Sequence, residues 1–171
     1  LLVIAAGEYE QFAKPQNILY TKGTVDFWLS PISDEFDGAQ RTYLKSSDYG
    51  TKAGVLLRKL GTGGENAFLA NFSDELGVEY ETRIANSAYD LAPNEWIRIT
   101  VNWDFTTPGQ AVHVYFNGVE ASYEQTVTGP RDMALSATGG LLFIGNESED
   151  GNTPANGLID DFKIYASVVT P

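Results

Sequence analysis

Carboxylates are the side chains of this sequence best placed to do chemistry. One pair is adjacent in the sequence, which limits where its two side chains can lie. Asp160 and Asp161 lie within the apolar-rich run 157–165, whose alternation predicts a strand. Adjacent strand residues point to opposite faces, so two neighbouring carboxylates cannot both be comfortably buried. One of them therefore needs a partner, and backbone N–H groups, Lys163 or an arginine would serve.

Two other sets of residues could take part in catalysis. Glu79 and Glu81 fall on one face of a predicted strand, as a nucleophile and a general acid would. The single histidine, His113, alternates with Val112 and Val114 and so lies on the less buried face of its strand. No Ser-His-Asp arrangement is visible around it. We therefore expect no catalytic site.

The composition describes a folded, acidic chain. Its 171 residues suit one domain covering 1–171, and 9 Phe, 9 Tyr and 3 Trp exclude a disordered chain. The net charge of −12 repels the phosphate backbone, so nucleic acid is not an expected partner. With no cysteine, disulfides and thiolate chemistry are excluded. The opening apolar run 1–6 is far shorter than a membrane span, so we expect no membrane insertion.

Short alternating runs separated by Gly, Pro, Asn and Asp clusters predict an all-β chain. About a dozen strands imply two packed sheets. The pair Asn117-Gly118 predicts a tight hairpin, so the strands at 96–104, 111–118 and 121–127 should form an antiparallel meander. The remaining candidates are 2–6, 23–31, 40–45, 53–60, 66–72, 77–84, 133–136, 140–145 and 157–165.

Three segments in order resemble laminin G-like domains of the concanavalin A-like lectin and glucanase superfamily. GTVDFWLSP at 23–31 is similar to the family's opening strand. EWIRITVNWD at 95–104, followed by VYFNG at 114–118, is similar to its central hairpin. LFIG at 142–145 and NGLIDDFKIY at 156–165 are similar to its closing segment. The resemblance implies a two-sheet antiparallel jelly-roll sandwich, closed by the last strand beside the first.

The same resemblance gives the acidic pair a role. In similar domains an Asp of the last strand binds a structural calcium ion, which implies Asp161 as a ligand, with Asp160 and Glu8 nearby. Calcium prefers six to eight oxygen ligands, as carboxylates and carbonyls provide. The alternative remains that Asp161 is paired with Lys163. The two tryptophans of the matching motifs, Trp28 and Trp96, are expected to be structural.

Sugar-binding domains of this architecture stack pyranose rings on exposed aromatic side chains and bind hydroxyls through polar ones. We favour Tyr49 and Tyr89, which occur in polar, loop-like surroundings, with Arg83 and Asn71 as hydrogen-bonding residues. Other candidates are Tyr43, Phe72, Tyr80 and Arg58.

These features predict a non-catalytic, lectin-like module of a secreted or cell-surface protein, with a polysaccharide or glycan as its partner. The alternative is a structural or adhesion domain of a surface fibre, spike or assembly, with a protein partner. A glycanase or lyase is the weaker alternative, because the E-x-D-x-x-E pattern of the related hydrolases is absent.

Overall fold

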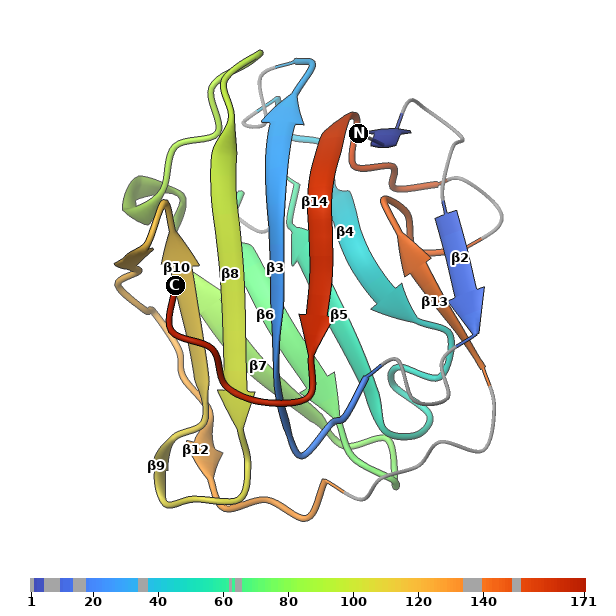
Figure 1. The fold of residues 1–171 in the computed structure, drawn as a ribbon, viewed down its shortest axis with the longest axis vertical. Coiled ribbons are helices and arrows are strands. Elements are labelled where there is room, and N and C mark those ends of the chain that lie inside the picture. The colour runs from blue at the N-terminus through green and yellow to red at the C-terminus, as the bar shows by residue number, and fades with distance from the viewer. Residues whose placement is uncertain are drawn as a thin grey trace.

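Two six-stranded antiparallel sheets form a sandwich (Figure 1). The computed structural model describes residues 2–4, 10–13, 18–33, 37–61, 63, 66–133, 140–148 and 152–171. The first sheet, called here the β8 sheet, contains in spatial order β1 (Leu2–Ile4), β14 (Gly157–Tyr165), β3 (Lys22–Pro31), β8 (Ile97–Asp104), β10 (Val112–Phe116) and β11 (Val119–Glu120).

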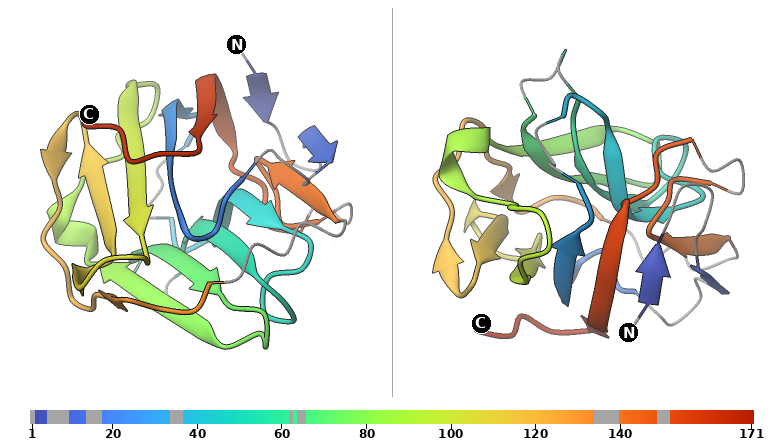
Figure 2. Two further views of the ribbon diagram at one scale, coloured as in Figure 1. Left: turned by 60° about the horizontal axis from the view of Figure 1, so that its bottom comes forward. Right: turned by 90° about the horizontal axis from the view of Figure 1, so that it is seen from above.

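The second sheet, called here the β6 sheet, packs behind the first. Its order is β2 (Glu10–Ala13), β13 (Leu141–Ile144), β4 (Arg41–Ser46), β5 (Gly54–Lys59), β6 (Phe68–Ser73) and β7 (Glu79–Ile84). A short ribbon of β9 (Gly109–Gln110) and β12 (Thr128–Gly129) and one 3-10 turn, Asn86–Ala88, complete the described elements. Figure 2 shows the two sheets as stacked layers. None of the described helices is long and apolar enough to cross a membrane.

Aromatic side chains from both sheets fill the space between the layers. Phe68 packs edge-on against Phe116, with ring centroids 5.5 Å apart, and Phe72 lies 5.2 Å from Trp103. The Trp103 indole N–H donates to the carbonyl of Leu19 at 2.9 Å, so its polar atom is satisfied inside the core. The apolar side chains that alternate along the strands therefore lie on one face of each sheet, and these two faces form a shared core.

The predicted jelly-roll sandwich is confirmed, and so is its closure, because Leu2 pairs with Ile159. Within the meander, β8 and β10 pair as predicted. The third strand was misplaced: it is β11, directly after the Asn117-Gly118 turn, because a two-residue turn lets pairing resume at Val119. Residues 121–127 form a bend with a single bridge from Gln125 to Arg83. Strand β2 was missed, and the predicted strand at 133–136 lies mostly outside the described residues.

Candidate functional site

A compact loop after β4 positions Tyr49. The amide of Tyr49 donates to the Ser46 carbonyl at 3.1 Å, and the amides of Thr51 and Lys52 both donate to the Asp48 carbonyl. Gly54 follows, and a Cβ there would lie only 2.5 Å from the Cα of Tyr49. A residue without a side chain is therefore required where the loop folds back on the start of β5.

Tyr49 reaches the outer face of the β6 sheet, the face turned away from the core. Its hydroxyl donates to Glu79 Oε2 at 3.0 Å. Burial raises the pKa of Tyr49, a hydrogen bond from Asn71 opposes that shift, and the charge of Glu79 reinforces it. The hydroxyl thus stays protonated and keeps its role as donor.

Asn71 and Arg58 carry buried polar atoms without partners on this face. Asn71 lies between the core residues Ala70 and Phe72, so its side chain points outward, yet the residue is only 2% exposed. Neither Asn71 Oδ1 nor Arg58 Nε has a hydrogen-bond partner among the described residues. Buried polar atoms are normally paired, so each is an unmet acceptor or donor. We call Tyr49, Arg58, Asn71 and Glu79 the Asn71 face.

The other two predicted binding residues lie elsewhere. Arg83 shares the outer face, two residues beyond Glu81 on β7, and its Nε donates to Glu124 Oε2 at 2.7 Å. Tyr89 is in the core: it is 8% exposed, stacks on Phe116 at 4.9 Å and donates its hydroxyl to a backbone carbonyl. Its polar neighbours suggested a surface ring, but the ring packs against Phe68 and Phe116 in the core. Tyr43 and Phe72 are fully buried as well.

The acidic pair does not sit as strand alternation predicts. The register shifts between Asp160 and Lys163, and Asp161 has a φ of 51°, so an irregularity in β14 leaves both carboxylates exposed. Asp161 accepts a hydrogen bond from the Lys163 ammonium, and Asp160 Oδ1 accepts one from the Asp161 amide.

A calcium ion at Asp161 Oδ2 would compete with Lys163 for that oxygen. Among the described residues no group of three His, Cys, Asp or Glu side chains could hold a metal ion. Glu8, the third predicted ligand, lies outside the described residues, so calcium stays a prediction.

Two tryptophans expected to be structural are exposed. Trp28, on the outer side of the β8 sheet, is 37% exposed, and Trp96, directly before β8, is 42% exposed. Phe27, beside Trp28, takes the core position instead. Strand alternation places Trp28 on the same face as the polar residues Asp26 and Ser30, which indicates an exposed side chain. The expectation of a structural role came from the family motif instead.

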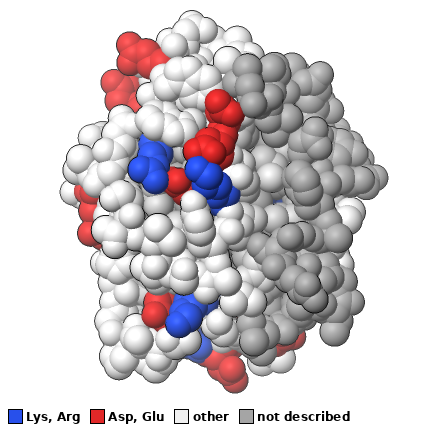
Figure 3. Space-filling model, viewed as in Figure 1, with Lys and Arg blue, Asp and Glu red and all other residues white. Residues whose placement is uncertain are grey.

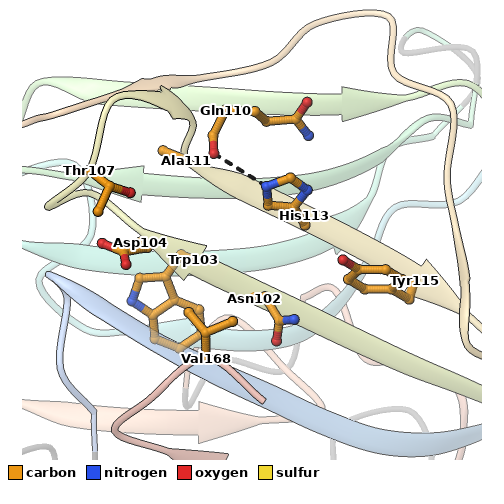
Figure 4. A pocket seen from close by; sticks show the side chains of 9 residues that line it. All are labelled: Asn102, Trp103, Asp104, Thr107, Gln110, Ala111, His113, Tyr115 and Val168. Carbon is orange, nitrogen blue, oxygen red and sulfur yellow. Dashed lines mark hydrogen bonds between the residues drawn. The ribbon is translucent and has the colours of Figure 1, made fainter. Parts of the chain in front are cut away.

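A cavity of about 340 Å³ opens on the same sheet, near the C-terminal segment (Figure 4). His113 points into it, with Nδ1 2.6 Å from Glu120 Oε1 and Nε2 3.2 Å from the carbonyl of Gln110. His113 therefore has two hydrogen-bond partners, and neither is a serine. The lining includes Asn102, Asp104, Gln110, His113, Tyr115 and Val168.

Glu79, one of the carboxylates considered for catalysis, has a structural contact, and so does Asp74 in the turn before β7. Glu79 accepts the Tyr49 hydroxyl, and Asp74 closes its turn by accepting the amides of Leu76 and Val78. Desolvation raises the pKa of Asp74, but those amides and the Tyr80 hydroxyl lower it more, so the carboxylate stays ionised. A general acid needs the opposite shift.

Architecture and surface together define a two-sheet jelly-roll domain with polar and aromatic outer faces. The chain belongs to the concanavalin A-like lectin/glucanases superfamily, whose laminin G-like family model matches residues 6–171. No curated protein matches the sequence.

Solved structures of low sequence identity share the fold. A heptameric SAP-like pentraxin from Limulus polyphemus is 14% identical with a TM-score of 0.60, and the match covers 95% of this chain and 71% of the pentraxin. A candidate carbohydrate binding protein from Bacteroides ovatus is 15% identical with a TM-score of 0.64, covering 98% of this chain and 43% of that one. The binding domain of botulinum neurotoxin serotype D is 15% identical with a TM-score of 0.63, covering 98% and 38%. This chain thus spans less than half of the last two structures.

Proposed function

We propose that this chain is a non-catalytic carbohydrate-binding module that holds a glycan on the Asn71 face. The observation that carries the proposal is the buried, unpaired Oδ1 of Asn71 beside the half-exposed ring of Tyr49. A sugar hydroxyl that reaches this face can donate to Asn71 Oδ1 or accept from Arg58 Nε, the two unpaired atoms there. The ring of Tyr49 supplies an apolar surface next to them.

The charge of the chain selects among glycans. A net charge of −12 repels uronic acids and sulfated sugars, so a neutral polysaccharide is the favoured ligand. The Bacteroides ovatus protein of the same fold is described as a candidate carbohydrate binding protein, which agrees with this class of ligand. A glycan-binding module of this kind belongs on a secreted or cell-surface protein.

Affinity electrophoresis tests the proposal. Native gels containing laminarin, xyloglucan or galactomannan should retard the protein, whereas gels containing anionic alginate should not. Tyr49→Ala and Asn71→Ser should each weaken retardation about tenfold, because each removes one contact of roughly 1.4 kcal/mol. Leu76→Ala, at an exposed turn, is the matched control and should migrate as the wild type.

If no glycan retards the folded protein, the glycan proposal fails and the adhesion alternative takes its place. In that case light scattering should reveal self-association or binding to a protein partner.

A further inference from the structure

We propose a second glycan-binding site on the opposite sheet, formed by Trp28, Arg98 and Trp96 and called here the Trp28 patch. The proposal rests on the proposed function for its class of ligand, but its location is independent of the Asn71 face. It gives one molecule two binding surfaces, one on each outer side of the sandwich.

Strand register brings Trp28 and Arg98 together, and Trp96 lies at the start of the same strand. Phe27 and Leu29 of β3 face the core, as do Ile97 and Ile99 of β8. Their neighbours therefore face outward. Trp28 lies directly opposite Arg98. Trp96 directly precedes β8 and is two residues from Arg98 along the chain.

Hydrogen bonds hold the side chain of Arg98 toward Asp26 on the outer face, next to Trp28. Its Nε and Nη2 donate to the two oxygens of Asp26 at 2.9 Å each, and Thr100 donates to Asp26 Oδ1 at 2.7 Å. The backbone amide of Arg98 donates to Asn117 Oδ1 at 2.9 Å. A guanidinium has five N–H groups, so donors remain for a ligand without any cost of ordering the side chain.

Acceptors lie on the other side of Trp28. Asp160 of β14 is the cross-strand partner of Trp28, and the ion pair of Asp161 and Lys163 follows it. Figure 3 views this face of the molecule and shows basic and acidic side chains lying next to one another on it. Donors and acceptors beside an aromatic plane are what a polyhydroxylated ring requires.

The size of the patch favours a sugar over a protein. At 37% and 42% exposure the two indoles present roughly 100 Å² each, judging from the area of a tryptophan side chain. A stable protein interface buries about 800 Å² per partner. One pyranose ring stacked on an indole, with its hydroxyls turned to Arg98 and Asp160, matches the smaller area.

The test measures two things: retardation of the protein in gels that contain polysaccharide, and the ability of one protein molecule to hold two polysaccharide chains at once. The Trp28→Ala Trp96→Ala double variant should bind the retained polysaccharide threefold to tenfold more weakly, from the loss of aromatic stacking. Its matched control is Leu76→Ala Val119→Ala, which also removes two exposed apolar side chains. Wild-type protein bound to an insoluble form of that polysaccharide should capture a soluble fluorescent form of it. Both the Trp28→Ala Trp96→Ala and the Tyr49→Ala Asn71→Ser proteins should fail to capture it.

The outcomes separate the two proposals. If the wild type is retarded but captures no soluble polysaccharide, and the tryptophan double variant is retarded equally, the second site is overturned. The Asn71 face then remains as the binding site. Retardation lost in the tryptophan double variant alone supports the Trp28 patch and overturns the Asn71 face. Absence of retardation in every protein overturns the proposed function and the glycan ligand of this patch with it. Self-association that the tryptophan double variant abolishes, with retardation unchanged, assigns the patch to a second copy of the chain.

Discussion

The carboxylate of Asp26 accepts two hydrogen bonds of 2.9 Å from the guanidinium of Arg98 on the outer face of the β8 sheet. Asp26 is buried and Arg98 is half-exposed, so the pair is only partly screened by solvent. Desolvation raises the pKa of Asp26, but Arg98 and Thr100 outweigh it and hold the pKa below the ordinary value of 3.8.

Asp26→Asn should therefore destabilise the protein in a pH-dependent way. A carboxyl whose pKa is lowered by folding adds stability above its unfolded value and loses it as pH falls through the folded one. We expect urea unfolding to show a deficit of about 1 kcal/mol at pH 7 that shrinks progressively below pH ~4. Asp161→Asn, in the exposed pair with Lys163, is the control and should show no measurable change. An equal deficit at pH 7 and pH 2.5 would contradict the ion-pair explanation.

Gly23 lies against the buried indole of Trp103. A Cβ at residue 23 would stand 2.5 Å from Trp103 Cζ2 and 2.7 Å from the carbonyl oxygen of Tyr165. Gly23→Ala should thus lower the free energy of unfolding by about 2 kcal/mol, because the core must shift to admit the methyl group. Gly63→Ala, with no atom within 4 Å, should be neutral or slightly stabilising in the same denaturation assay.

Asn102 fastens the C-terminal segment to the β8 sheet. Its Nδ2 donates to the carbonyl of Val169 at 3.0 Å, and the Val169 amide donates to Thr24 Oγ1 at 2.9 Å. Asn102→Ala should free this segment, so hydrogen exchange at the Val169 amide should accelerate, with about 1 kcal/mol lost in global stability. Ser122→Ala is the exposed control. Unchanged exchange at Val169 would show that Asn102 does not hold the segment.

Calcium binding at Asp161 can be decided by thermal melts. A metal site predicts a midpoint that rises with calcium, falls with a chelator and becomes insensitive to both in Asp161→Asn. The hydrogen bond from Lys163 leads us to expect equal midpoints in calcium and chelator. Loss of a calcium response in Asp161→Asn would instead establish the metal and imply that Lys163 moves aside.

The fold could be predicted because alternation and turn residues are local signals. Ile97 and Ile99 identify the core face of their strand from sequence alone, and so predict the outward direction of Arg98. What could not be predicted depends on partners distant in sequence. The pair of Asp26 and Arg98 requires the register of β3 against β8, and no local pattern gives that register.

The surface residues were the hardest to predict, for two physical reasons. Tyr89 follows polar residues, but burial is decided by how the 3-10 turn packs, so a ring expected at the surface lies against Phe116. Asp161 breaks strand alternation through its left-handed φ, which no neighbouring residue signals. Trp28 shows the reverse error, since a residue matching a family motif was expected to be structural and is exposed.

The pairing of Leu2 with Ile159 joins strands from opposite ends of the sequence, so it cannot form before β14 has been synthesised. One edge of β3 has no neighbour until β14, its partner on that side, has been made. Contacts so distant along the chain form slowly, and an unpaired strand edge invites pairing with other chains. A ribosome-bound chain that ends before residue 157 should therefore depend on chaperones, and release of the last strand should be the step that commits the sandwich to its native state.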